Sequence, residues 1–150
     1  PALVNAGASA ICENKNVSSE EFNFAFNLMK NCGKVIKTTE DKMDVITALS
    51  GSGPAFYFKI INSLALAGEK LGLNYEESLL LSSQTALGSA KMVLEETLEG
   101  DSDIKTLIKN VTTPGGCTEV GNNILDNSNI DEILAETIEK TMLKAIDLGK

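Results

Sequence analysis

Histidine is absent from this chain of 150 residues, and cysteine occurs only three times. The three cysteines, Cys12, Cys32 and Cys117, are widely separated, and no two of them form a Cys-x-x-Cys motif. This pattern supports neither a disulfide framework nor a zinc site, because both need paired ligands. Cys117 stands at a predicted helix start, but the chain has no histidine to activate its thiol. We therefore expect no bound metal and no catalytic cysteine.

Positive charge is also scarce. Lysine and arginine together number 13 against 21 aspartates and glutamates, which gives a formal net charge of −8. Nucleic acids and anionic membranes both favour clustered Lys and Arg, so we expect neither as a partner. No apolar run approaches the roughly 18 to 20 residues that a membrane span needs. We therefore expect a cytoplasmic protein. Hydrophobic residues make up 43% of the chain, which suffices for one core.

Two glycine-rich breaks interrupt a largely helical pattern. Residues 50–55 are Ser-Gly-Ser-Gly-Pro-Ala, and residues 112–118 are Thr-Thr-Pro-Gly-Gly-Cys-Thr. In each, hydroxyl residues precede a proline that suits the first position of a helix. Both breaks are therefore predicted to be helix starts with free backbone amides, where the helix dipole favours a carboxylate or phosphate. The alternative is ordinary turn chemistry at a helix entrance, with no ligand.

The first forty residues are predicted to form a strand, a helix and a second strand. Residues 2–11 alternate small and branched side chains, and residues 34–39 form another short β-rich run. Between them, Ser18 with acidic residues directly after it predicts a helix start, and Gly33 predicts the helix end. Two strands joined by a helix in this way fit the end of a parallel sheet.

From about Asp41 the periodicity is helical to the end of the chain. The two longest helices carry apolar residues around much of their circumference, which predicts burial on more than one side and suits a core between subunits. The small residues 88–90 would let another helix approach closely. Packing inside a single subunit is the alternative. The predicted helices are 54–71, 75–98, 101–111, 118–125 and 130–148.

Four segments, in order along the chain, carry a resemblance to a known family. They are residues 44–58, which contain Leu-Ser-Gly-Ser-Gly-Pro-Ala; 67–73, Ala-Gly-Glu-Lys-Leu-Gly-Leu; 84–92, Gln-Thr-Ala-Leu-Gly-Ser-Ala-Lys-Met; and 111–118, Val-Thr-Thr-Pro-Gly-Gly-Cys-Thr. Together these segments resemble the C-terminal part of pyrroline-5-carboxylate reductase. Residues 1–4 resemble the end of a longer motif of the same family. The resemblance covers essentially the whole chain.

The resemblance implies a mostly α fold with a small α/β remnant. Residues 1–40 would be the end of a Rossmann-like nucleotide-binding domain. Residues 41–150 would form a helical dimerisation and substrate-binding domain, similar to the C-terminal domain of 6-phosphogluconate dehydrogenase. The chain has no Gly-x-Gly-x-x-Gly turn between a strand and a helix, so NADP or NAD would be bound mainly by an N-terminal half outside these residues. We therefore expect the chain alone to be inactive.

The implied reaction is the reduction of a cyclic imine, 1-pyrroline-5-carboxylate, to L-proline, the last step of proline biosynthesis. The protein must hold the substrate carboxylate, donate to the ring nitrogen and set the imine carbon against the nicotinamide. Thr118 stands where the family has a threonine that bonds the substrate nitrogen, and it is the expected catalytic residue. For Cys117 the resemblance implies a contact between its backbone and the substrate, and it implies no role for the side chain. The expected substrate-binding residues are Thr112, Thr113, Gly115, Gly116, Cys117 and Thr118, and the expected cofactor-binding residues are Ser52, Gly53 and Pro54.

We expect a homodimer or a higher homo-oligomer that acts on a small molecule. Two other classes of function stay open. A non-catalytic helical oligomerisation module would explain the apolar helices equally well, but it has no reason to gather amides and threonines at residues 112–118. Another dehydrogenase with a similar helical C-terminal domain would carry a lysine and asparagine pair for proton transfer, and we find no convincing pair. Sequence alone does not choose an assisting acid among Glu95, Glu96 and Glu99.

Overall fold

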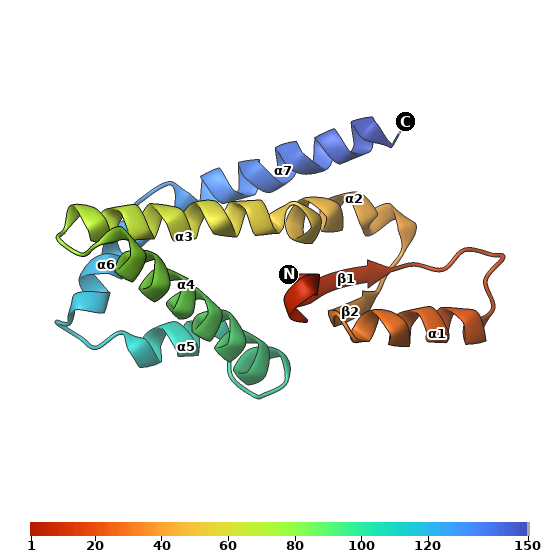
Figure 1. The fold of residues 1–150 in the computed structure, drawn as a ribbon, viewed down its shortest axis with the longest axis horizontal. Helices are drawn as coiled ribbons and strands as arrows, with labels where there is room; N and C mark the ends of the chain where they lie inside the picture. The colour runs from red at the N-terminus through yellow and green to blue at the C-terminus, as the bar shows by residue number, and fades with distance from the viewer. Residues whose placement is uncertain (150) are drawn as a thin grey trace. The chain divides into compact units, whose positions relative to one another are not determined.

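The computed structural model describes residues 1–149, which form two compact units. One unit comprises Pro1–Phe56 together with Ile133–Lys150, and the other comprises Tyr57–Glu132. Nearly all regular structure is helical apart from one two-stranded parallel sheet, which confirms the predicted fold class (Figure 1). The predicted division of the chain near residue 40 stays a prediction. No helix in the described part of the chain is long and apolar enough to cross a membrane.

The sheet of the first unit pairs β1 (Gly7–Ile11) with β2 (Gly33–Lys37) in parallel, from Gly7 opposite Gly33 to Ile11 opposite Lys37. Helix α1 (Ser19–Lys30) makes the crossover, so the predicted strand–helix–strand order is confirmed. A capping box starts α1: the Ser18 hydroxyl accepts from the Glu21 amide, and the Glu21 carboxylate accepts from the Ser18 amide. These hydrogen bonds from Ser18 hold the pKa of Glu21 below its usual range.

Two predicted boundaries in this unit were wrong. The first strand begins at Gly7 and not at residue 2, because Ala2–Val4 form a 3-10 turn that ends in left-handed Asn5, with φ 56°. Gly33 does not end α1, which stops at Lys30. It opens β2 at φ 143°, where a Cβ would collide with the backbone of Gly7. A glycine is therefore required there by the close approach of the two strands.

Aromatic packing links α1 to the sheet. Phe22 is only 6% exposed, and the Lys37 ammonium of β2 lies 4.6 Å from the centroid of its ring. Phe26, one helical turn further on, stacks on Phe22 with 6.2 Å between the ring centroids. A cation above an aromatic face is attracted to the ring, so this contact fixes the helix on one side of the sheet.

A helical hairpin dominates the second unit. Helix α3 (Gly53–Lys70) ends in a turn at Gly72, with φ 111°, and α4 (Tyr75–Met92) starts at Asn74, whose side chain accepts from the Glu77 amide at 2.8 Å (Figure 1). Near the turn the helices touch: a Cβ on Gly68 would lie 2.6 Å from the Ser78 Oγ. Ser78 is 2% exposed, and its Oγ has no hydrogen-bond partner among the described residues.

The remaining helices follow the predicted order with small shifts. A π-helical turn, Val93–Leu98, prolongs α4, which accounts for the predicted end near residue 98. The next helix starts later than predicted, because Asp103 caps it by accepting from the Thr106 amide at 2.7 Å. Hydrogen bonds from Thr106 also hold the pKa of Asp103 below its usual range. These helices are α5 (Ile104–Val111), α6 (Cys117–Asp126) and α7 (Ile130–Leu148).

Very little apolar surface is buried within the described chain. Phe22, Ala48 and Ala65 are its buried hydrophobic residues, and no large side chain is fully buried. In contrast, large side chains of the hairpin are widely exposed, among them Phe58 at 66% and Leu87 at 60%. Large apolar side chains exposed on two neighbouring helices are more typical of an interface than of a monomer surface.

We predict that Gly68→Ala lowers the free energy of unfolding by about 1 to 3 kcal/mol, because the added methyl group overpacks the contact with Ser78. Ser78→Ala is expected to be neutral or stabilising, since it removes a buried hydroxyl that has no partner. Urea denaturation followed by circular dichroism measures both.

Gly121→Ala in α6 is the matched control, because a Cβ there meets nothing within 4 Å. That change should stabilise the helix by about 0.5 to 1 kcal/mol. A Gly68→Ala protein that gains stability like the control would contradict the close helix contact.

Candidate functional site

The first glycine-rich break is not an open helix start. Helix α2 (Met43–Ile46) runs into a π-helical turn, Thr47–Gly51, and then directly into α3. The Ser52 amide donates to the Thr47 carbonyl at 2.8 Å, the i to i−5 bond of a π-helix. The prediction of free amides was therefore wrong here, since a π-turn lets the chain keep bonding through the glycines instead of ending and restarting.

This geometry limits what the predicted cofactor-binding residues can do. The Ser52 amide is already bonded, and Pro54 has no N–H to donate. Gly53 is buried, yet a Cβ on it would meet nothing within 4 Å. The turn lacks the row of free amides that cradles a pyrophosphate. Neither Ser52 nor Pro54 therefore has a free amide to offer a nicotinamide dinucleotide.

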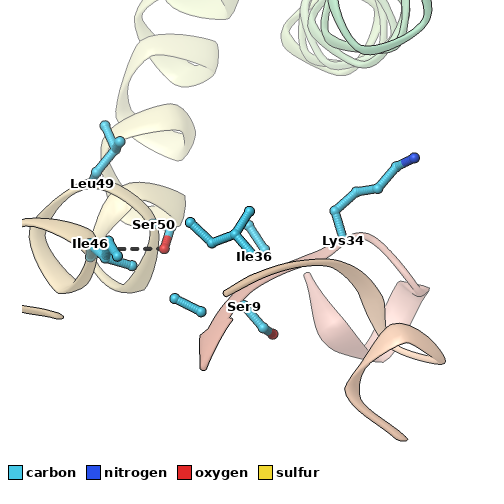
Figure 2. Close-up of a pocket in the computed structure, with 8 residues that line it drawn as sticks. Ser9, Lys34, Ile36, Ile46, Leu49 and Ser50 are labelled. Atoms are coloured by element: carbon cyan, nitrogen blue, oxygen red, sulfur yellow. Dashed lines mark hydrogen bonds between the residues drawn. The ribbon is translucent and has the colours of Figure 1, made fainter. Parts of the chain in front are cut away.

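A small apolar hollow of about 150 Å³ lies beside this turn, within the first unit. Ala8, Ser9 and Ala10 of β1 line one side of it, and the opposite side is formed by the π-turn and its neighbours (Figure 2). The Ser50 hydroxyl donates to the Ile46 carbonyl at 3.1 Å, and the Lys34 side chain extends away from the turn (Figure 2). With its polar groups turned to the backbone or away, the hollow has little to orient a polar ligand.

The second break is a true helix start. Helix α6 begins at Cys117 with Gly116 as its N-cap, and Gly115 adopts a left-handed conformation with φ 73°. Pro114 lies two residues before the cap, so its predicted place in the first helical position was wrong. The amides of Cys117 and Thr118 belong to the first turn of the helix, where no carbonyl of the helix can accept from them. The positive end of the α6 dipole lies at the same point.

The two glycine amides of this loop are not free, contrary to prediction. The Gly115 amide donates to the Glu119 carboxylate, Oε2, at 2.9 Å. The Gly116 amide donates to the Thr113 carbonyl at 2.9 Å and closes a tight turn. The donors still open at the loop are therefore the amides of Cys117 and Thr118.

The three threonines of the loop differ in what their hydroxyls do. Thr112 donates to the Ile108 carbonyl at 2.7 Å and accepts from the Asn122 side chain at 2.9 Å, so its only proton is already used. The hydroxyls of Thr113 and Thr118 are exposed and make no hydrogen bond to any described residue. Thr118 thus presents a free hydroxyl next to free amides, whereas Thr112 holds the loop.

Sequence reasoning missed two residues of this site, Glu119 and Asn122. Glu119 lies three residues after the cap, where an acidic side chain often reaches back to the chain before the helix, so the capping-box pattern could have indicated it. Nothing in the sequence pattern indicated Asn122. It lies in α6, and its side chain donates to the hydroxyl of Thr112, the residue that directly follows α5.

The acid that bonds to the loop is Glu119, which the sequence did not single out. Glu95 pairs with Lys91 along its own helix, at 3.7 Å. Neither Glu95 nor Glu96 bonds to residues 112–118. Cys117 is exposed and is not in a disulfide. The loop consequently presents two open amides, two free threonine hydroxyls and the Glu119 carboxylate, groups that can hydrogen-bond to a carboxylate and a ring nitrogen.

Comparison with known proteins shows the family of this chain. Residues 40–148 match the family described as pyrroline-5-carboxylate reductase dimerisation. The chain belongs to the pyrroline-5-carboxylate reductase family. A pyrroline-5-carboxylate reductase from Aquifex aeolicus is 39% identical over 142 residues, which cover 95% of this chain and 52% of the relative. One from Glycine max is 37% identical and is covered over 53% of its length, against 99% of this chain.

Solved structures of the pyrroline-5-carboxylate reductase family have the same fold. A reductase from Coxiella burnetii has a TM-score of 0.90 and 38% identity, over 98% of this chain and 53% of its own. One from Plasmodium falciparum, determined with NADP bound, has a TM-score of 0.88 and 35% identity, over 100% of this chain and 60% of its own. The predicted family is thus confirmed, and the chain spans about half the length of the curated relatives it matches.

Proposed function

We propose that this chain supplies the substrate seat and the dimerisation surface of a pyrroline-5-carboxylate reductase. The reaction is the reduction of 1-pyrroline-5-carboxylate to L-proline, the final step of proline biosynthesis. The observation that carries the proposal is the start of α6, where free amides and a free threonine hydroxyl lie together. A cytoplasmic location stays a prediction.

The substrate carboxylate is received by the open backbone amides of Cys117 and Thr118, and by the Gly115 amide once the Glu119 carboxylate is displaced from it. An anion at a helix N-terminus gains from both the N–H donors and the helix dipole. Gly115 and Gly116 leave room for close approach, because neither has a side chain. Thr112, bonded to Ile108 and Asn122, is assigned to holding the loop and not to contact with substrate.

Thr118 is assigned to the ring nitrogen. Its hydroxyl can donate a hydrogen bond or accept one, so it can orient the imine nitrogen through its change from imine to amine. The reacting imine needs chiefly placement, since a protonated C=N bond is a good electrophile. Thr113 and the Cys117 backbone complete the predicted substrate contacts.

The nicotinamide dinucleotide, NADPH or NADH, supplies the hydride when bound. We assign Ser52, Gly53 and Pro54 to contact with it through backbone shape alone, given that the Ser52 amide is already bonded. Its pyrophosphate and adenosine would be held by residues outside these 150, since the connection from β1 to α1 contains no glycine.

We further propose that two or more copies associate through α3 and α4. Within the second unit, large apolar side chains of both helices are exposed, among them Phe58 of α3 and Leu87 of α4. A second copy is the simplest cover for apolar faces of this size, as obligate homodimers bury about 2,000 to 5,000 Å².

Thr118→Ala should lower kcat/KM for 1-pyrroline-5-carboxylate about ten- to a hundredfold, because loss of a hydrogen bond to a buried polar group costs roughly 1 to 3 kcal/mol. The assay uses residues 1–150 joined to the nucleotide-binding half of the Aquifex aeolicus relative, with NADPH oxidation as readout. Thr118→Ser keeps the hydroxyl and should retain most activity. An unchanged kcat/KM in Thr118→Ala would assign the nitrogen contact to another residue.

Self-association is measured by light scattering on the 150-residue chain at micromolar concentration. We expect a dimer or larger species, and Leu87→Asp should shift it toward monomer by placing a charge in the apolar face. Leu3→Asp, at a fully exposed leucine outside the hairpin, is the control and should leave the mass unchanged. A wild-type monomer would contradict the proposed interface.

The 150-residue chain by itself should neither bind NADPH tightly nor reduce 1-pyrroline-5-carboxylate. The reason is that dinucleotide affinity depends on a glycine turn and helix start that hold the pyrophosphate, and residues 1–40 contain no such turn. Isothermal titration calorimetry tests the binding. A micromolar dissociation constant would mean that we have misplaced the nucleotide site.

A further inference from the structure

The Glu119 side chain already occupies part of the proposed substrate seat. Its Oε2 accepts from the Gly115 amide at 2.9 Å, and the side chain is half-buried. The positive φ of Gly115, 73°, belongs to a loop conformation that glycine adopts most easily. The group at the mouth of the loop is therefore a carboxylate, the same chemical group that the substrate would bring.

The contact between Glu119 and Gly115 has a structural role at the start of α6. Glu119 is the third residue of α6 and reaches back as the acid of a capping box does, but it accepts from the amide of Gly115, one residue before the N-cap Gly116. The same contact also lies within the proposed substrate seat. The N–H that Glu119 occupies is one of those that we assign to the substrate carboxylate, and one N–H cannot serve two carboxylates with good geometry.

We propose that Glu119 is an internal competitor that sets the affinity of the seat for carboxylate ligands, an inference that rests on the proposed function. An incoming carboxylate must displace the Glu119 carboxylate from Gly115 or bind beside it, and two negative charges at that distance repel. Glu119 also keeps the loop in its binding shape while no ligand is present. Glu119 therefore determines how tightly the seat binds carboxylate ligands, and it is not a catalytic residue.

The test is titration of the ¹⁵N-labelled 150-residue chain with L-proline, observed by NMR at the amides of residues 112–118. Glu119→Gln keeps an oxygen that can accept from Gly115 but removes the charge. We expect it to bind L-proline about three- to tenfold more tightly than wild type, the effect of removing one like charge near a partly solvated site. L-Prolinamide, which has the ring nitrogen but no carboxylate, should gain nothing.

Glu76→Gln is the matched control. Glu76 is an exposed acid in the first turn of α4, one position earlier in its helix than Glu119 in α6, so the substitution makes the same charge change at another helix start. It should leave the affinity for L-proline unchanged. Glu119→Ala removes both the charge and the hydrogen bond to Gly115, so comparing it with Glu119→Gln, which removes only the charge, separates the two roles. The proposal expects Glu119→Ala to bind L-proline more tightly than wild type and to have a more mobile loop.

The outcomes are distinguishable. If L-proline shifts the loop amides but Glu119→Gln binds it equally or more weakly, the competitor role is wrong and the proposed function stands. If L-proline shifts no amide of residues 112–118 in any of the proteins, the proposed function fails and this inference fails with it. An equal gain for L-proline and L-prolinamide would show that the gain does not depend on the ligand carboxylate, and it would overturn the competitor role.

Discussion

Helices α3 and α4 carry more apolar surface than 150 residues can cover, and the rest of the structure depends on that imbalance. Within the described chain only small side chains are fully buried in the hairpin, such as Ala65, while large ones such as Phe58 and Leu87 remain exposed. Hydrophobic burial is the main favourable term in folding, at about 25 cal/mol per Å². A hairpin built in this way gains most of its stability only when another surface covers it.

The contact between Gly68 and Ser78 shows how the hairpin is nevertheless defined within one copy. Close approach near the turn needs a residue without a Cβ on α3, and the Asn74 capping box then sets where α4 begins. Local rules of capping and steric fit therefore give the helices their ends. Coverage of their long apolar faces is left to association.

The two glycine-rich breaks have similar composition but different structures. At residues 50–55 the chain stays helical through a π-turn, and the Ser50 hydroxyl bonds to the Ile46 carbonyl one turn earlier. At residues 112–118 the chain leaves one helix and starts another, with a left-handed Gly115 between them. Only the second arrangement exposes a helix start, and for this reason the substrate seat is assigned there.

Local sequence determined a large part of this protein. Periodicity and caps predicted the order of the helices, the parallel strand–helix–strand unit, the Ser18 start of α1 and the helix start near Thr118, because these depend on residues within one or two turns of one another. Motif order predicted the family.

The tertiary structure decided the π-turn at Thr47–Gly51 and the roles of the polar groups in the site. Whether the Thr112 hydroxyl is free depends on Asn122, ten residues away, and whether the Gly115 amide is free depends on how α6 places Glu119. Hydrogen-bond donors and acceptors are paired by three-dimensional proximity, so a list of candidate residues becomes a site only when the fold has assigned each group its partner.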